Sequence, residues 1–113
     1  MEDAWDITKG EPNVIITMLD AGFDLHEDLD PNKTLGLSQT WKNNAHGMAI
    51  LGIIAAQRNS IGIAGIAGIA PNVKLQGFKV FTEEGLIGDN AVKNLINTAQ
   101  NIGSRLFTNS WQS

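Results

Sequence analysis

An almost unbroken apolar run near the start of the chain constrains the fold more than any other feature. The run spans Val14–Leu19, is rich in β-branched residues, follows Pro12 and Asn13, and ends at Asp20. A strand without polar alternation is covered on both faces, which is typical of a parallel sheet flanked by helices. The sequence therefore predicts a buried strand over residues 14–19 with a carboxylate directly after it.

Helical and extended patterns alternate after this strand. Apolar residues recur at helical spacing from His46 to about Ala56, and Asn43 or Asn44 is the expected N-cap. The other predicted elements are a short strand at 34–37, a strand at 73–81, a turn at 82–85, a helix capped by Asp89 or Asn90 and stopped by Gly103, and a strand at 106–109. The order strand, helix, strand, helix, strand predicts an α/β fold with a parallel sheet and right-handed crossovers.

The last predicted strand lies close to the end of the sequence. Such a strand would expose an unpaired edge, which folded proteins usually avoid. We therefore expect residues 1–113 to form the first half of a larger doubly wound domain.

Composition and charge exclude several classes of function. The 113 residues carry 12 acidic against 8 basic side chains, a net charge of −4, which argues against nucleic-acid binding and against a cationic membrane-surface helix. No apolar run reaches the roughly 18–20 residues of a membrane span, and the acidic start Met1–Trp5 is unlike a signal peptide. Cysteine is absent, so thiol catalysis, disulfides and Cys-ligated zinc are excluded.

Two residues that can carry chemistry fall where an open α/β sheet places its site, beyond the carboxyl ends of the strands. Asp20 follows the first strand, and His46 opens the first long helix. A carboxylate and an imidazole that converge there would form the orienting half of an Asp-His-nucleophile triad. Each residue also has a simpler interpretation, as a turn or capping residue, and together they are compatible with a small-molecule-binding domain. A nucleotide-binding domain is disfavoured, because no G-x-G-x-x-G opens a helix and no Walker lysine exists.

Five ordered motifs, between about Trp5 and Trp111, resemble one known family, the subtilisin-like serine peptidases. They are NVIITMLDAGFD at 13–24 followed by EDL at 27–29, NAHGMA at 44–49 followed by GIIAA at 52–56, IGIAGIA at 61–67 followed by APNVKL at 70–75, KVF at 79–81, and NSW at 109–111. The resemblance implies the three-layer α/β/α subtilisin-like fold, with only its N-terminal half present.

The same resemblance implies a catalytic role for two residues. Asp20 would orient the imidazole of His46 and stabilise its charged form, and His46 would be the general base toward a serine hydroxyl. The family's nucleophilic serine lies in a Gly-Thr-Ser-Met-Ala-like segment, and neither that segment nor the oxyanion asparagine has a match here. The function expected is a serine-type endopeptidase domain fragment, with the isolated chain inactive. The alternative is a non-catalytic subtilase remnant or binding module on the same half-fold.

The resemblance also implies partners and a location. Peptides or proteins would be substrates, and the C-terminal half of the domain would be an intramolecular partner. Ser110, Trp111 and Gln112 would line the pocket for the substrate residue before the scissile bond, and the segment around Gly85 would pair with the substrate backbone as an added strand. Secretion is usual in the family, although Met1–Trp5 offers no support for it.

A calcium site is the second feature that the resemblance implies. The matching ligand positions are Asp28, Gln57, Asn59, Ile61 and Ile63. Side-chain oxygens and backbone carbonyls from a tight, glycine-containing loop can supply most of the six to eight ligands that calcium needs. An Asn-Ser turn without an ion is the alternative for this segment.

Three positions depart from the family's usual pattern. Ala21 stands where the family usually has a Thr or Ser whose hydroxyl supports the aspartate, and Met48 stands where it usually has Thr. Gln112 replaces a glycine on the pocket wall. Gly-Ile-Ala is repeated three times at 62–70, and the extra copy resembles a local insertion.

Overall fold

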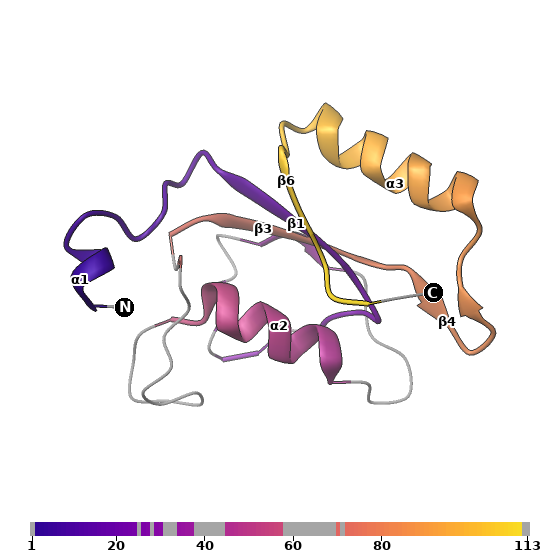
Figure 1. Cartoon of the computed structure of the whole chain (residues 1–113), viewed down its shortest axis with the longest axis horizontal. Helices are drawn as coiled ribbons and strands as arrows, with labels where there is room; N and C mark the ends of the chain where they lie inside the picture. The colour runs from indigo at the N-terminus through magenta and orange to yellow at the C-terminus, as the bar shows by residue number, and fades with distance from the viewer. Residues whose placement is uncertain are drawn as a thin grey trace.

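The computed structural model describes residues 2–24, 26–27, 29–30, 34–37, 45–57, 70 and 72–111. Its centre is a parallel sheet of four strands in the order β2-β3-β1-β6, and a two-stranded antiparallel hairpin, β4-β5, lies beside it (Figure 1). The elements in chain order are α1 Glu2–Trp5, β1 Ile15–Asp20, β2 Thr34–Leu37, α2 His46–Ala55, β3 Lys74–Lys79, β4 Phe81–Thr82, β5 Gly85–Leu86, α3 Asp89–Asn101 and β6 Leu106–Asn109.

The strand register brings three carboxyl ends to one edge of the sheet. In β1, Asp20 is paired with Lys79 at the end of β3, and Leu19 is paired with Asn109 at the end of β6. Because all three strands run parallel, residues that follow them gather at this edge. The central strand β1 therefore delivers Asp20 between its two neighbours.

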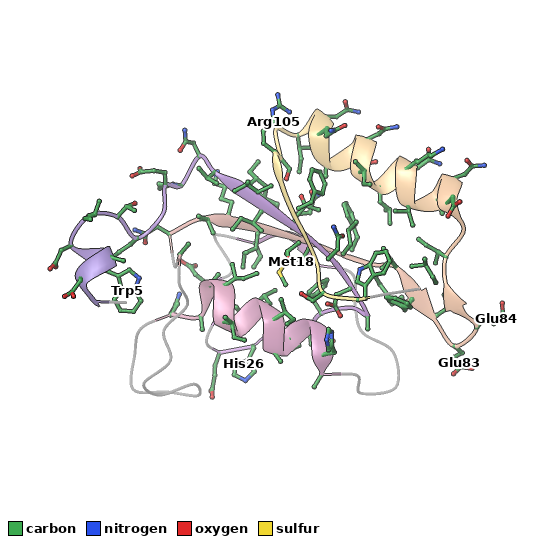
Figure 2. All side chains as sticks on the ribbon, in the orientation of Figure 1. Trp5, Met18, His26, Glu83, Glu84 and Arg105 are labelled. Atoms are coloured by element: carbon green, nitrogen blue, oxygen red, sulfur yellow. The ribbon has the colours of Figure 1, made fainter. Side chains whose placement is uncertain are left out.

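Helices lie on both sides of the sheet, so the predicted three-layer α/β/α arrangement is confirmed. Figure 1 shows α2 below the strands and α3 above them. Met18 points from the sheet toward α2 (Figure 2), and both belong to the main apolar core. The buried members of this core are Met18, Phe23, Leu29, Leu51, Ala55, Val73 and Leu75. Burying these side chains fixes α2 on the sheet, at about 1.5–3 kcal/mol for each large residue.

The helix caps differ from the predicted ones. The N-cap of α2 is Ala45, not Asn43 or Asn44, and the N-cap of α3 is Gly88. Asp89 instead lies in the first turn of α3, where its charge still favours the positive end of the helix dipole. Asn43 and Asn44 lie outside the described residues. The predicted stop of the second helix is confirmed, since Gly103 adopts a φ of 100° directly after the C-cap.

The predicted strand at 73–81 is shorter and is followed by a hairpin. β3 ends at Lys79. Val80, which follows it, donates its N–H to the Asp20 carbonyl at 2.8 Å and accepts the Ile87 N–H, also at 2.8 Å. The predicted turn at 82–85 is the tip of the β4-β5 hairpin. Figure 2 shows Glu83 and Glu84 projecting from this tip.

No helix in the described ranges is long and apolar enough to cross a membrane.

Three buried polar side chains join the middle of the sheet to the segment before β6. Thr17 Oγ1 donates to Ser104 Oγ at 2.7 Å and lies 3.4 Å from Gln76 Oε1. The Ser104 hydroxyl in turn lies 3.2 Å from the carbonyl oxygen of Ile15 and 3.3 Å from that of Leu106. Buried polar groups cost free energy unless they are hydrogen-bonded, so this cluster specifies how β6 docks on β1.

Replacing Thr17 tests that specification. Thr17→Val keeps the shape of the side chain but removes the hydroxyl, and it should lower the free energy of unfolding by about 1–3 kcal/mol. The matched control is Thr98→Val, which removes an exposed hydroxyl on α3 and should change the value by less than about 0.5 kcal/mol. Urea unfolding measures both, and equal losses would contradict the role given to the cluster.

Candidate active site

Asp20 and His46 meet at the carboxyl edge of the sheet, as the predicted geometry requires. Asp20 is the last residue of β1, and His46 is the first residue of α2. The Nδ1 atom of the imidazole lies 2.7 Å from Oδ1 of the carboxylate. This distance is that of a charge-assisted hydrogen bond.

The two partners differ sharply in exposure. The Asp20 side chain is 3% exposed, whereas the His46 side chain is 51% exposed. A buried carboxylate needs hydrogen-bond donors to replace the water it has lost, and the imidazole is one of them. The rest of the imidazole ring is accessible to solvent, while the hydrogen bond to Asp20 fixes the orientation of the ring.

A backbone N–H supplies further support for the Asp20 carboxylate. The Ala21 N–H donates to Asp20 Oδ1 at 2.7 Å. The same oxygen therefore receives both the backbone donor and the imidazole. Ala21 has no side-chain donor, so the orientation of the carboxylate depends on the backbone at the end of β1.

The loop after β1 is held tightly against the start of α2. The Asp24 N–H donates to the Met48 sulfur at 3.0 Å, so Met48 ties this loop to the helix that carries His46. Gly47 packs directly against the loop, because a Cβ at that position would collide with the Gly22 carbonyl oxygen and contact the Phe23 ring. Only glycine at position 47 lets the helix approach this closely.

A pocket of about 360 Å³ opens beside the Asp20–His46 pair. Its lining comes from the ends of β1, β4 and β6 and from the start of α2. The lining residues are Asp20, Ala21, His46, Phe81, Thr82, Ser110 and Trp111. Acid, imidazole and an aromatic wall thus share one concave surface, the usual form of a binding site.

Not all of the residues predicted to bind substrate line the pocket. Ser110 and Trp111 both line the pocket. Gly85 does not line it, but lies across the β4-β5 hairpin from Thr82, which does. Gln112 lies outside the described residues.

Three pocket residues, Ala21, Phe81 and Thr82, were not predicted as site residues. Phe81 and Thr82 form β4, which follows the carboxyl end of β3 after one intervening residue, at the edge of the sheet where the site forms. The available signal was an aromatic residue, Phe81, at the carboxyl end of the strand predicted at 73–81. The ring of Phe81 meets that of Trp111 edge to face, with centroids 5.4 Å apart and an interplanar angle of 86°.

Of the predicted calcium ligands, only Gln57 belongs to the described residues, where it follows the end of α2 and is half-buried. Asp28, Asn59, Ile61 and Ile63 lie outside them. Within the described ranges, no group of three or more His, Cys, Asp or Glu side chains is placed to hold a metal ion. The Ala70 N–H donates to the Ile54 carbonyl at 2.9 Å, which ties the chain after this segment to the end of α2.

Comparison with known proteins identifies the family. The sequence model described as "Subtilase family" matches residues 11–113, and the chain belongs to that family.

Several curated proteins are similar in sequence. The chain is 35% identical over 89 residues to a thermophilic serine proteinase from Bacillus sp. (strain AK1), covering 73% of this chain and 22% of that protein. It is 26% identical over 128 residues to fervidolysin from Fervidobacterium pennivorans, covering 97% of this chain and 18% of that protein. It is 36% identical over 76 residues to subtilisin BL from Lederbergia lenta, covering 64% of this chain and 27% of that protein. The chain thus spans about a fifth to a quarter of the length of these relatives.

Two solved structures are similar in fold. The prenylagaramide maturation protease PagA matches with a TM-score of 0.77 and 22% identity, covering 99% of this chain and 39% of that one. A lanthipeptide protease matches with a TM-score of 0.68 and 25% identity, covering 99% of this chain and 32% of that one. The sheet and its two helix layers therefore have the architecture of subtilisin-like proteases.

The close approach of α2 to the loop after β1 leads to a prediction. Gly47→Ala should push the start of α2 away from Gly22 and lower the free energy of unfolding by about 1–3 kcal/mol, because a methyl group has no space there. The control is Gly36→Ala in β2, where nothing lies within 4 Å of an added Cβ. Chemical denaturation measures both variants. An unchanged stability for Gly47→Ala would show that the loop and the helix are not in tight contact.

Proposed function

We propose that this chain supplies the aspartate and the histidine of an Asp-His-Ser triad in a serine-type endopeptidase. The observation that carries the proposal is the 2.7 Å contact between His46 Nδ1 and Asp20 Oδ1, with the carboxylate buried and the imidazole exposed in a pocket. Membership of the subtilase family supports the same assignment.

The geometry assigns a separate task to each nitrogen of the ring. When Nδ1–H donates to Asp20, Nε2 of the neutral imidazole carries the lone pair and can accept a proton from a serine hydroxyl. Asp20 then stabilises the imidazolium that forms, and His46 returns the proton to the leaving amine. Because Asp20 is buried and held by Ala21 N–H, the imidazole needs little reorganisation during the reaction.

The nucleophile of this proposal is a serine outside residues 1–113. The family's Gly-Thr-Ser-Met-Ala-like segment has no counterpart in the sequence, and the chain spans only a fraction of the length of its relatives. We infer that residues 1–113 form part of the peptidase domain. The remaining part of the subtilisin-like fold would bring the serine to the pocket and cover the free edge of the sheet.

A peptide or protein substrate fits the shape and the edges of this site. Ser110 and Trp111 would form the wall that contacts the residue before the scissile bond, together with Phe81. The β4-β5 hairpin carries Gly85 and Leu86 on a short strand that an extended peptide can join through main-chain hydrogen bonds. Gln112 would extend the same wall.

We also propose that the chain binds one structural calcium ion through Asp28, Gln57, Asn59 and the carbonyls of Ile61 and Ile63. The donor set is made of oxygen atoms only, which is the chemistry calcium prefers. The Ala70–Ile54 hydrogen bond supports the proposal, since it brings the end of the loop back to α2 next to Gln57. Bound calcium would stabilise the native state.

We propose that the protein acts outside the cytoplasm. A relative that is 29% identical over 89 residues is named as the minor extracellular protease Epr of Bacillus subtilis, and the chain spans 13% of its length.

Mutation of the triad residues tests the proposed function. In the product of the full open reading frame that encodes these residues, Asp20→Asn should lower kcat toward a fluorogenic peptide by about 10⁴-fold, and His46→Ala by about 10⁶-fold. Matched controls are Asp6→Asn and His26→Ala, which change exposed residues outside the pocket and should leave kcat unchanged. A fluorophosphonate probe should label a serine only when Asp20 and His46 are intact. Wild-type protein that neither hydrolyses peptides nor reacts with the probe would favour a non-catalytic binding module.

Calcium titration tests the metal proposal independently of activity. Calcium should raise the Tm of the 113-residue chain, because an ion that binds only the native state stabilises it by mass action. Asp28→Asn should remove most of this rise, whereas Asp6→Asn should retain it. A Tm that calcium does not change in the wild-type chain would contradict the site.

A further inference from the structure

The residue directly before Asp20 is held by a side chain from the far end of the chain. The indole Nε1–H of Trp111 donates to the Leu19 carbonyl at 2.7 Å. Leu19 is the last β1 residue paired with β6, where it lies opposite Asn109. The indole therefore donates a hydrogen bond to β1 at the position where the pairing of β1 with β6 ends.

The indole is itself fixed by the chain that follows β3. Phe81 packs its ring against Trp111 in an edge-to-face contact at 5.4 Å. Val80, the residue before Phe81, donates its N–H to the Asp20 carbonyl at 2.8 Å. Consequently the carbonyl before the Asp20 side chain and the carbonyl after it are both held, one by Trp111 and the other by Val80.

This backbone support matters because the side-chain support of Asp20 is small. Asp20 Oδ1 receives the Ala21 N–H and the His46 Nδ1, each at 2.7 Å, and Ala21 cannot add a hydroxyl. A carboxylate held this way follows any movement of the strand end. A shift of a fraction of an ångström would therefore change its hydrogen bond to the imidazole, which needs a fixed distance and angle.

We propose that Trp111 is a positioning residue for the Asp20–His46 pair, in addition to forming part of the pocket wall. Its indole N–H holds the end of β1 and so keeps the Asp20 carboxylate within hydrogen-bond distance of His46 Nδ1. The inference rests on the proposed function, because it assigns a purpose to a geometry that matters only if Asp20 orients His46.

Proton exchange in the product of the full open reading frame tests this role without any measurement of catalysis. The readouts are the NMR exchange rates of the His46 Nδ1–H and of the Ala21 backbone N–H, the two protons that point at Asp20 Oδ1. Trp111→Phe keeps an aromatic ring but removes the donor, and both rates should rise on the order of tenfold, the change that corresponds to losing one ordinary hydrogen bond. The matched control is Trp5→Phe in α1, which Figure 1 shows at the opposite side of the molecule from β4, and it should leave both rates unchanged.

A third variant separates failure of this inference from failure of the proposed function. Asp20→Ala should abolish the slowly exchanging His46 signal. If it does, and Trp111→Phe leaves both exchange rates within about twofold of wild type while lowering only the Tm, Trp111 is merely structural and the inference is overturned. If Asp20→Ala leaves the His46 signal intact, the Asp20–His46 pair is absent and the proposed function itself is overturned.

A measurement on the wild-type chain covers the case in which Trp111→Phe does not fold. Exchange of the Trp111 indole N–H, the Ala21 N–H and the His46 Nδ1–H is followed as urea is added below the unfolding transition. If one local opening releases the strand end, the three protection factors should fall in parallel. An indole proton that becomes unprotected while the Ala21 and His46 protons stay protected would overturn the proposal.

In the product of the full open reading frame, Trp111→Phe should also change the kinetic constants. Trp111→Phe should lower kcat more than it raises KM, because a misplaced general base reduces the stabilisation of the transition state rather than the binding of the substrate in the ground state. A rise in KM alone, with kcat unchanged, would assign Trp111 to the pocket wall only and would contradict its positioning role.

Discussion

A buried carboxylate at the end of the central strand is the constraint on which the rest of the site depends. Asp20 is 3% exposed and must be satisfied by donors that the fold brings to it. Among the described residues, one donor is local, the Ala21 N–H, and another, His46, is 26 residues away on a different element. The parallel register of the strands and the position of α2 therefore determine together whether this carboxylate has its hydrogen-bond partner.

Backbone donors and close packing hold Asp20 and the start of α2 in this chain. Where the family usually places hydroxyl residues, the chain has Ala21 and Met48. The Ala21 backbone N–H donates to the Asp20 carboxylate, and the Met48 sulfur, which accepts the Asp24 N–H, ties the loop after β1 to the helix. The contact between Gly47 and Gly22 removes the space in which the two elements could shift. Backbone donors and tight contact thus hold the acid and the imidazole close together.

The elements that local patterns determine were predicted well, whereas those decided by long-range contacts were not. The last strand was predicted to begin at Leu106, where β6 does begin, because an apolar segment between a glycine stop and polar residues has few alternatives. The first strand extends to Asp20 rather than ending at Leu19, since Val80 donates to the Asp20 carbonyl. That bond joins residues 60 positions apart, and no pattern in the first strand encodes it.

The candidate site shows the same division. Asp20 and His46 could be named from strand-end and helix-start positions, and the resemblance to subtilisin-like peptidases gave them roles. The aromatic wall could not be assembled in this way, because Phe81 and Trp111 meet only after β1, β3 and β6 have aligned. The bond from the indole to Leu19 spans 92 residues and depends on where β6 ends.

The tautomer of His46 is the measurement that tests the central claim most directly. If Asp20 orients the ring as a general base, the neutral imidazole carries its proton on Nδ1 and its lone pair on Nε2. Nitrogen-15 NMR of the histidine-labelled chain above the pH at which the ring is charged distinguishes the two nitrogens. The account predicts a protonated Nδ1 and an unprotonated Nε2 for His46, and a change of tautomer in Asp20→Ala. A His46 ring that carries its proton on Nε2 in the wild-type chain would contradict it.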